Sequence, residues 1–148
     1  GSRMIAYLDA SALVKRYVDE ADSRAVHALV ADAAAVSTAT ISGAEVPAAI
    51  AKAARMALLT RREAEAAVQA FQADWDYLIR LQVTEALVRR AASLAWEQAL
   101  RGFDAVHLAA ALLWAEATGE PAHLATFDRQ LWHAAHAFGL PPWPAIAP

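Results

Sequence analysis

The 148-residue chain is rich in apolar residues, 58% against 20% charged, which excludes an intrinsically disordered protein and predicts a fold with a sizeable core. Its net charge of −3 and pI near 5.9 exclude a strongly basic nucleic-acid binder, so any binding of a polyanion has to be local. The absence of cysteine excludes disulfides and thiolate metal sites, and it agrees with a reducing compartment.

The length and the first residues of the sequence predict a single domain without a signal peptide. Residues 1–3, before Met4, look like a cloning remnant, and we expect residues 4–148 to form a single domain. No stretch approaches the roughly 20 apolar residues that span a bilayer. The apolar start that ends at Leu8 lacks a basic leader and runs directly into Asp9. We therefore expect neither a membrane segment nor a signal peptide, and a cytoplasmic protein.

The first half of the chain alternates apolar runs with helical patterns. A short apolar run ending at Leu8 reads as a buried strand, which delivers Asp9 at its end. The expected elements that follow are a helix over 10–17, a helix over 21–31, a weak strand over 34–38 and a long helix over 41–59. Pro47 lies inside the last of these and predicts a bend or break there.

The second half continues the alternation. Thr60 and Glu63 form a capping-box pattern that begins another helix. The next expected elements are a strand over 78–83, a helix over 84–100 ended by Gly102, a buried helix over 105–117 opened by Asp104, a strand over 122–126, a helix from Asp128 to 138 and an extended piece around 143–146. Because parallel strands need helical crossovers, this order predicts an α/β fold with a mainly parallel sheet.

Four acidic residues lie at the positions where binding sites form in such a fold. In open α/β sheets, sites form where the carboxyl ends of strands meet loops and helix starts. Asp9 and Asp128 lie at two such ends, Asp104 opens a helix and Glu45 lies early in one. Carboxylates that share a site raise one another's pKa, and a divalent cation is the usual way to keep them ionised. An all-oxygen set favours Mg²⁺ or Mn²⁺ over Zn²⁺.

Each acid also has a purely structural explanation. Asp104 and Asp128 could be ordinary helix N-caps, and Glu45 could complete a capping box with Ser42. Asp9 is harder to explain in this way, because a carboxylate that ends an apolar strand is partly buried, and burying it unpaired is costly. Spacing alone leaves the joint site a modest hypothesis.

Other polar and aromatic residues are weaker candidates. Lys15 and Arg16 follow the first strand closely and are possible contacts to RNA phosphate, although a basic pair is more often a solvated helix face. His107, in the buried helix, is expected to support the site or the core rather than to bind a metal. His133 and His136 are expected at the surface, and the five tryptophans are expected mainly in the core or a dimer contact.

Several segments together resemble one known family. They are Tyr-Leu-Asp9-Ala-Ser-Ala-Leu-Val-Lys, Glu45 in a mid-chain helix, Phe103-Asp104-Ala-Val-His-Leu-Ala and Thr126-Phe-Asp128-Arg. With them the sequence resembles the PIN-domain family, and within it the VapC-type toxins of prokaryotic toxin–antitoxin pairs, from Met4 to about Pro142. Any single match would be weak evidence, and the coordinated set is strong evidence.

The resemblance implies a fold, an activity and partners. It implies a three-layer α/β/α sandwich with a short, mainly parallel central sheet, and an endoribonuclease that hydrolyses RNA phosphodiester bonds with Mg²⁺ or Mn²⁺. It further implies inhibition by a cognate antitoxin protein and a homodimer. Asp9, Glu45 and Asp104 look like the core acidic triad, and Asp128 looks like the fourth, more variable acid.

The resemblance also extends to the residues around the acids. Ser11 and Thr126 correspond to the small hydroxyl residues that accompany the family's site and bind a water, the metal or a phosphate. The segment around Glu45 departs from the pattern, since Gly43 and Pro47 flank it where stronger helix formers are expected.

Three other functions remain as alternatives. A receiver-like signalling domain also ends a strand on Asp, but it needs a second acidic pair beside the first loop, which is not visible here. A non-catalytic PIN-like binding module would typically have lost an acid, and this chain keeps all four. A DNA-directed nuclease is the nearer competitor, because the same metal centre cannot by itself read a 2′-hydroxyl.

Overall fold

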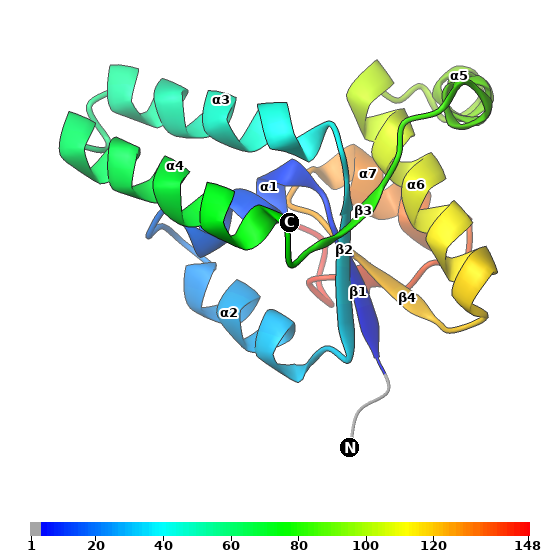
Figure 1. The fold of residues 1–148 in the computed structure, drawn as a ribbon. Helices are drawn as coiled ribbons and strands as arrows, with labels where there is room; N and C mark the ends of the chain where they lie inside the picture. Colours follow the sequence, from blue (N-terminus) through cyan, green and yellow to red (C-terminus); the bar gives the residue numbers. More distant parts are fainter. Residues whose placement is uncertain (1–3) are drawn as a thin grey trace.

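The centre of the molecule is a five-stranded sheet in which all neighbouring strands are parallel. The computed structural model describes residues 4–148, so the expected cloning remnant at residues 1–3 lies outside the described residues. The strand order is β3-β2-β1-β4-β5, and Figure 1 labels the first four of these strands. The strands are β1 (Ile5–Leu8), β2 (Ala35–Ala39), β3 (Ile79–Leu81), β4 (Ala122–Ala125) and β5 (Pro142–Trp143). The predicted α/β fold with a parallel sheet is confirmed.

Helices cover both faces of this sheet (Figure 1). One layer contains α1 (Ala10–Leu13), α2 (Ser23–Asp32), α3 (Ser42–Arg55) and α4 (Arg61–Trp75). The other layer contains α5 (Glu85–Gln98), α6 (Gly102–Thr118) and α7 (Arg129–Ala137). The result is the three-layer α/β/α sandwich that the resemblance implied.

The central strand β1 divides its side chains between two cores. Ile5 and Tyr7 pack with α5, α6 and α7, whereas Ala6 and Leu8 pack with α1 to α4. All of these side chains are buried because helices cover both faces of the sheet, which is why the strand reads as a continuous apolar run. Such a strand cannot slip in register without moving apolar groups between cores, so Asp9 at its end is firmly placed.

The helix expected over 10–17 is shorter than predicted. The α-helical turn ends at Leu13, and a 3₁₀ turn, Val14–Arg16, continues it. Of the bend or break expected at Pro47, the break is wrong, because α3 runs through this residue without interruption, and the bend stays a prediction. The fixed φ of proline is helical, and the missing N–H removes only the hydrogen bond to the carbonyl of Gly43 near the helix start.

Gly102 was expected to end one helix, and instead it begins the next. Helix α5 ends at Gln98, the C-cap Ala99 after it takes a left-handed conformation with φ of 54°, and Arg101 is the extended residue before α6. Asp104 therefore lies in the first turn of α6 rather than at its cap. The strand expected over 78–83 is shorter, because only three of its residues pair with β2 at the sheet edge.

Two expectations concerned the chain as a whole, namely the lack of a membrane segment and the single domain. Across residues 4–148, no helix has both the length and the apolar character needed to cross a bilayer. The assignment of residues 4–148 to one domain stays a prediction.

Candidate active site

The four predicted acids lie around one cavity at the carboxyl edge of the sheet. Parallel strands place their carboxyl ends on the same edge, so Asp9 after β1 meets the turn between β4 and α7, which carries Asp128. Helices α3 and α6 add Glu45 and Asp104. The cavity has a volume of about 250 Å³, and all four acids line it.

Asp9 is the most buried of these acids, and its carboxylate accepts three hydrogen bonds. Oδ1 accepts from the Ser11 hydroxyl at 2.7 Å and from the Ala12 N–H at 3.0 Å, and Oδ2 accepts from the Thr126 hydroxyl at 2.5 Å. Burial raises the pKa of Asp9, and this effect outweighs the lowering by His107 and by the three hydrogen bonds. An ionised Asp9 is therefore costly until a cation approaches it.

Ser11 and Thr126 connect two turns that are far apart in the sequence. Besides donating to Asp9, the Ser11 oxygen accepts from the N–H of Phe127 at 2.9 Å. The Thr126 oxygen accepts from the N–H of Asp128 at 3.0 Å. These hydroxyls thus fix both the orientation of Asp9 and the position of the turn that carries Asp128. Their expected contact with water, metal or phosphate stays a prediction.

Asp104 and Asp128 share one guanidinium. Arg101 donates from Nε to Asp104 Oδ2 at 2.9 Å and from a terminal nitrogen to Asp128 Oδ2 at 2.6 Å. Burial raises the pKa of Asp104 most, the Asp128 charge adds to the rise, and Arg101 lowers it. The two carboxylates raise the pKa of the guanidinium in return, so Arg101 is a cation already placed inside the acidic cavity.

Glu45 ends a hydrogen-bonded chain that begins in the core. His107 Nε2 lies 2.6 Å from Glu45 Oε1, and its Nδ1 lies 2.7 Å from the Tyr7 hydroxyl. Burial raises the pKa of Tyr7 well above its ordinary value, and the charges of Asp9 and Glu45 add to this effect. The hydroxyl therefore stays protonated, and this chain of contacts sets the orientation of Glu45. His107 supports the site from the core, as the sequence predicted.

The structural alternatives for the acids are only partly correct. Asp128 does cap α7, because its Oδ1 accepts from the Leu131 N–H at 2.9 Å, while its other oxygen faces the cavity. Asp104 is not an N-cap. The capping box with Ser42 does not form, since that hydroxyl bonds another hydroxyl at 2.7 Å.

Comparisons with known proteins identify the family. The family model described as PIN domain matches residues 6–137. This chain belongs to the PIN-domain family. Ribonuclease VapC45 and Ribonuclease VapC49, from two strains of Mycobacterium tuberculosis, are each 38% identical to this PIN domain over 142 residues, which are 95% of the chain and 96% of each relative.

Solved structures share the fold of this PIN domain at low sequence identity. VapC20 from Mycobacterium tuberculosis, described as a sarcin-ricin loop cleaving toxin, gives a TM-score of 0.64 at 19% identity over 97% of this chain and 99% of that one. A toxin-antitoxin complex from Klebsiella pneumoniae gives 0.63 at 16% identity, with the same coverage. FitAcB from Neisseria gonorrhoeae gives 0.61 at 18% identity, over 88% and 93% of the two chains.

The four carboxylates of this PIN domain are the type of ligand that a hard divalent cation prefers. Four carboxylates converge without a thiolate, and oxygen ligands are those that Mg²⁺ and Mn²⁺ prefer. Within residues 4–148, however, no three side chains of His, Asp or Glu are arranged to hold a metal ion together. Asp104 and Asp128 are paired with Arg101, and Glu45 is paired with His107. Metal binding therefore requires these pairs to rearrange.

Neither predicted basic contact lines the acidic cavity, although Lys15 Nζ lies 4.6 Å from the ring centroid of Phe127, which does line it. Lys15 donates to the carbonyl of Ala21 at 2.8 Å and lies 3.3 Å from a Glu20 oxygen. Arg16 lines a separate cavity on the same layer as α2, together with Asp74. The structure brings neither residue to the acids, and a contact with RNA phosphate stays a prediction.

Sequence reasoning missed two residues at the site. Arg101 could have been found, because it precedes Asp104 by three residues at a helix start, a spacing that places opposite charges together. Phe103 had no such signal, because only the structure leaves its ring exposed. His133 and His136 are exposed, as predicted. Trp96, expected in the core or a dimer contact, is 90% exposed and so is not a core residue.

Proposed function

We propose that this PIN domain is a metal-dependent endoribonuclease and the toxin of a type II toxin–antitoxin pair. The observation that carries the proposal is the convergence of Asp9, Glu45, Asp104 and Asp128 on one cavity from four separate segments. The 38% identical relatives, which match almost their whole length, are named ribonucleases. This supports RNA phosphodiester bonds as the substrate.

The same four acids would hold Mg²⁺ or Mn²⁺. A bound ion supplies a more acidic water and neutralises charge that develops on the phosphate. The chain's own hydroxyls hold Asp9 in one orientation, since Ser11 and Thr126 both donate to it. His107 orients Glu45 in the same way. Arg101, when it leaves the carboxylates, is the cation placed to bind the phosphate.

A cognate antitoxin, a homodimer and a cytoplasmic location complete the proposal. Solved structures with this fold include toxin–antitoxin complexes, which supports an antitoxin as partner. The pairing of Asp104 and Asp128 with Arg101 means that these acids accept a guanidinium readily. A partner segment that places an arginine in the cavity would therefore inhibit the site. The absence of cysteine supports a reducing compartment.

The first experiment measures cleavage of a structured RNA pool and of matched DNA, with Mg²⁺, Mn²⁺ or EDTA. We expect RNA cleavage that EDTA abolishes and that Asp9→Asn lowers by at least about 100-fold, the usual scale for loss of a positioned catalytic group. Glu97→Gln, which changes an exposed acid on α5, is the matched control and should cut normally. Repeating the assay with the co-expressed antitoxin should abolish cleavage.

Three outcomes would contradict parts of this proposal. Equal cleavage of DNA would favour the DNA-directed alternative. Cleavage that survives both EDTA and Asp9→Asn would remove the acidic cavity as its source. Failure of metal-loaded, folded protein to cut either polymer, while it still binds RNA, would favour the non-catalytic binding module.

A further inference from the structure

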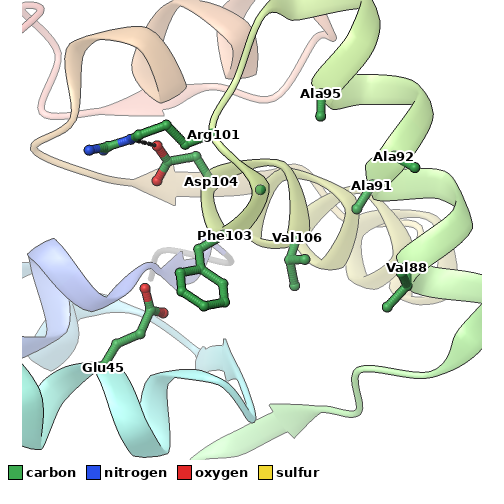
Figure 2. A pocket seen from close by; sticks show the side chains of 10 residues that line it. Glu45, Val88, Ala91, Ala92, Ala95, Arg101, Phe103, Asp104 and Val106 are labelled. Carbon is green, nitrogen blue, oxygen red and sulfur yellow. Dashed lines mark hydrogen bonds and ion pairs between the residues drawn. The ribbon is translucent and has the colours of Figure 1, made fainter.

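A second, larger cavity adjoins the acidic one. It lies between α5 and α6 and has a volume of about 670 Å³ (Figure 2). Its wall is mainly apolar, and it is made by Val88, Ala91, Ala92 and Ala95 of α5 and by Phe103 and Val106 of α6. The small alanine side chains leave the space that the cavity occupies.

The two cavities share part of their lining. Glu45, Arg101 and Asp104 line both of them, so the larger cavity begins where the acids end. In Figure 2 the Arg101–Asp104 pair lies on one side of the Phe103 ring and Glu45 on another. A ligand whose anionic group lies at the acids therefore places its adjacent group in this apolar space.

Phe103 has an exposure that packing does not explain. It directly precedes Asp104, yet 65% of its surface is exposed, and its ring lies outside the two apolar cores of the described residues. An exposed aromatic ring beside an acidic cleft is the side chain that single-stranded nucleic acids stack on. Burying it against a base would also remove an unfavourable apolar surface from water.

We infer that this cavity is a subsite for one nucleobase of the RNA substrate, with Phe103 as the stacking ring and the alanine face of α5 as the opposite wall. The inference rests on the proposed function and names the part of the substrate that the second cavity takes. The two cavities offer charged groups and then an apolar wall, in the same order as the phosphate and the base of a nucleotide. Acids and a guanidinium serve the phosphate, and an apolar slot serves the base.

The composition of the wall also predicts the specificity of this subsite. The ionisable side chains that line it, Glu45, Arg101 and Asp104, are at the end shared with the acids. Among the described residues that line it, the apolar end offers no side chain that could read the hydrogen-bonding edge of a base. We therefore expect the subsite to require an unpaired nucleotide and to discriminate weakly among the four bases.

The test uses an uncleavable RNA, a short single-stranded oligoribonucleotide with methylene groups in place of the bridging 3′ oxygens, because a metal-bound water would still attack phosphorus if only the 2′-hydroxyl were blocked. Its binding is measured by fluorescence anisotropy in the presence of Mn²⁺. Phe103→Ala should raise the Kd by about 5- to 100-fold, the loss expected for one base–aromatic stack. Phe103→Tyr should restore tight binding. Ala92→Leu, at an exposed position of the wall, should fill the slot and weaken binding without disturbing the core.

Trp96→Ala is the matched control. Trp96 is another exposed aromatic residue of α5, but it does not line the cavity, so its loss should leave the Kd unchanged. On cleavable RNA, Phe103→Ala should raise KM much more than it lowers kcat, because the base is bound in both ground and transition states. Thermal melting checks that each variant is folded.

Several results would overturn the inference. An unchanged Kd in both Phe103→Ala and Ala92→Leu would remove the base from this cavity. If light scattering shows that these two variants dissociate from a dimer to monomers while their RNA affinity is unaltered, the cavity belongs to a second copy of the chain. If the antitoxin no longer inhibits the two variants and nothing else changes, the cavity belongs to the protein partner. Tight, Phe103-dependent binding by a protein that does not cut RNA would instead contradict only the proposed function.

Discussion

Asp9 illustrates, at the scale of single residues, how an active site can oppose stability. Its carboxylate is buried and accepts three hydrogen bonds, yet burial still raises its pKa. The folded state therefore binds the Asp9 proton more tightly than the unfolded state does. The associated stability is present below the ordinary carboxyl pKa and is lost as pH rises through the raised pKa. At neutral pH the ionised group is a cost that a divalent cation offsets.

Asp9→Asn should raise the free energy of unfolding at neutral pH, by about 1 kcal/mol, the usual size of such gains. The gain should shrink as pH falls through the raised pKa of Asp9 and should be absent below the ordinary carboxyl pKa of about 4, because wild-type Asp9 is then neutral in both states. Urea unfolding with EDTA, at several pH values, measures both effects. Added Mn²⁺ should stabilise the wild type more than the variant. A variant that is less stable at neutral pH would show that the three hydrogen bonds outweigh burial.

At the scale of elements, the position of α3 decides where Glu45 lies. Helix α3 packs closely on α4 at Gly43, where a Cβ atom would lie 3.0 Å from Trp75 Cζ2. The Trp75 ring is itself held, since its centroid lies 5.3 Å from that of Phe71 and 5.3 Å from the guanidinium carbon of Arg80. Gly43, which departs from the family pattern, thus permits the close approach of two helices.

Gly43→Ala should destabilise the protein by about 1 kcal/mol, because overpacking of 1–3 kcal/mol exceeds the helix preference for alanine of about 1 kcal/mol. Cleavage should also slow, since a shift of α3 moves Glu45, two residues further on. Urea unfolding and the RNA assay measure these effects. Adding Trp75→Phe, which makes room for the methyl group, should reverse part of the loss. A stabilising Gly43→Ala would mean that Trp75 moves freely.

At the scale of the whole molecule, a net charge of −3 means that RNA must be bound through few contacts. Arg101 is the cationic side chain among the residues that line the acidic and apolar cavities, and Lys15 is engaged with the loop before α2. Affinity then depends on the metal site and on stacking more than on a basic surface.

The affinity for the uncleavable RNA should therefore fall only shallowly with salt. We expect a slope of log K against log salt of about −1 to −2, given about −0.7 for each phosphate contact on a single strand. Titrations at constant free Mn²⁺ measure the slope, and Arg101→Gln should make it shallower by about 0.7. A slope steeper than about −4 would reveal an extended basic surface and would restore Lys15 and Arg16 as phosphate contacts.

Local sequence patterns were enough to predict the alternation of strands and helices and the caps at Thr60 and Asp128. These features depend on backbone hydrogen bonds and side-chain spacing within a few residues, which a single segment determines by itself. Contacts between residues of the same segment can therefore be predicted from the sequence of that segment. The set of four acids, and with it the family, was indicated by the coordinated motifs around these acids, because any single motif is weak evidence.

Only the tertiary structure decided the pairings across the sheet edge. Tyr7 meets His107 from 100 residues away, and Arg101 joins Asp104 to Asp128. The left-handed turn at Ala99, rather than Gly102, sets where α6 begins and so where these groups point. Such contacts, and the cavity beside Phe103, depend on how two layers of helices pack on one sheet, and no local pattern records that packing.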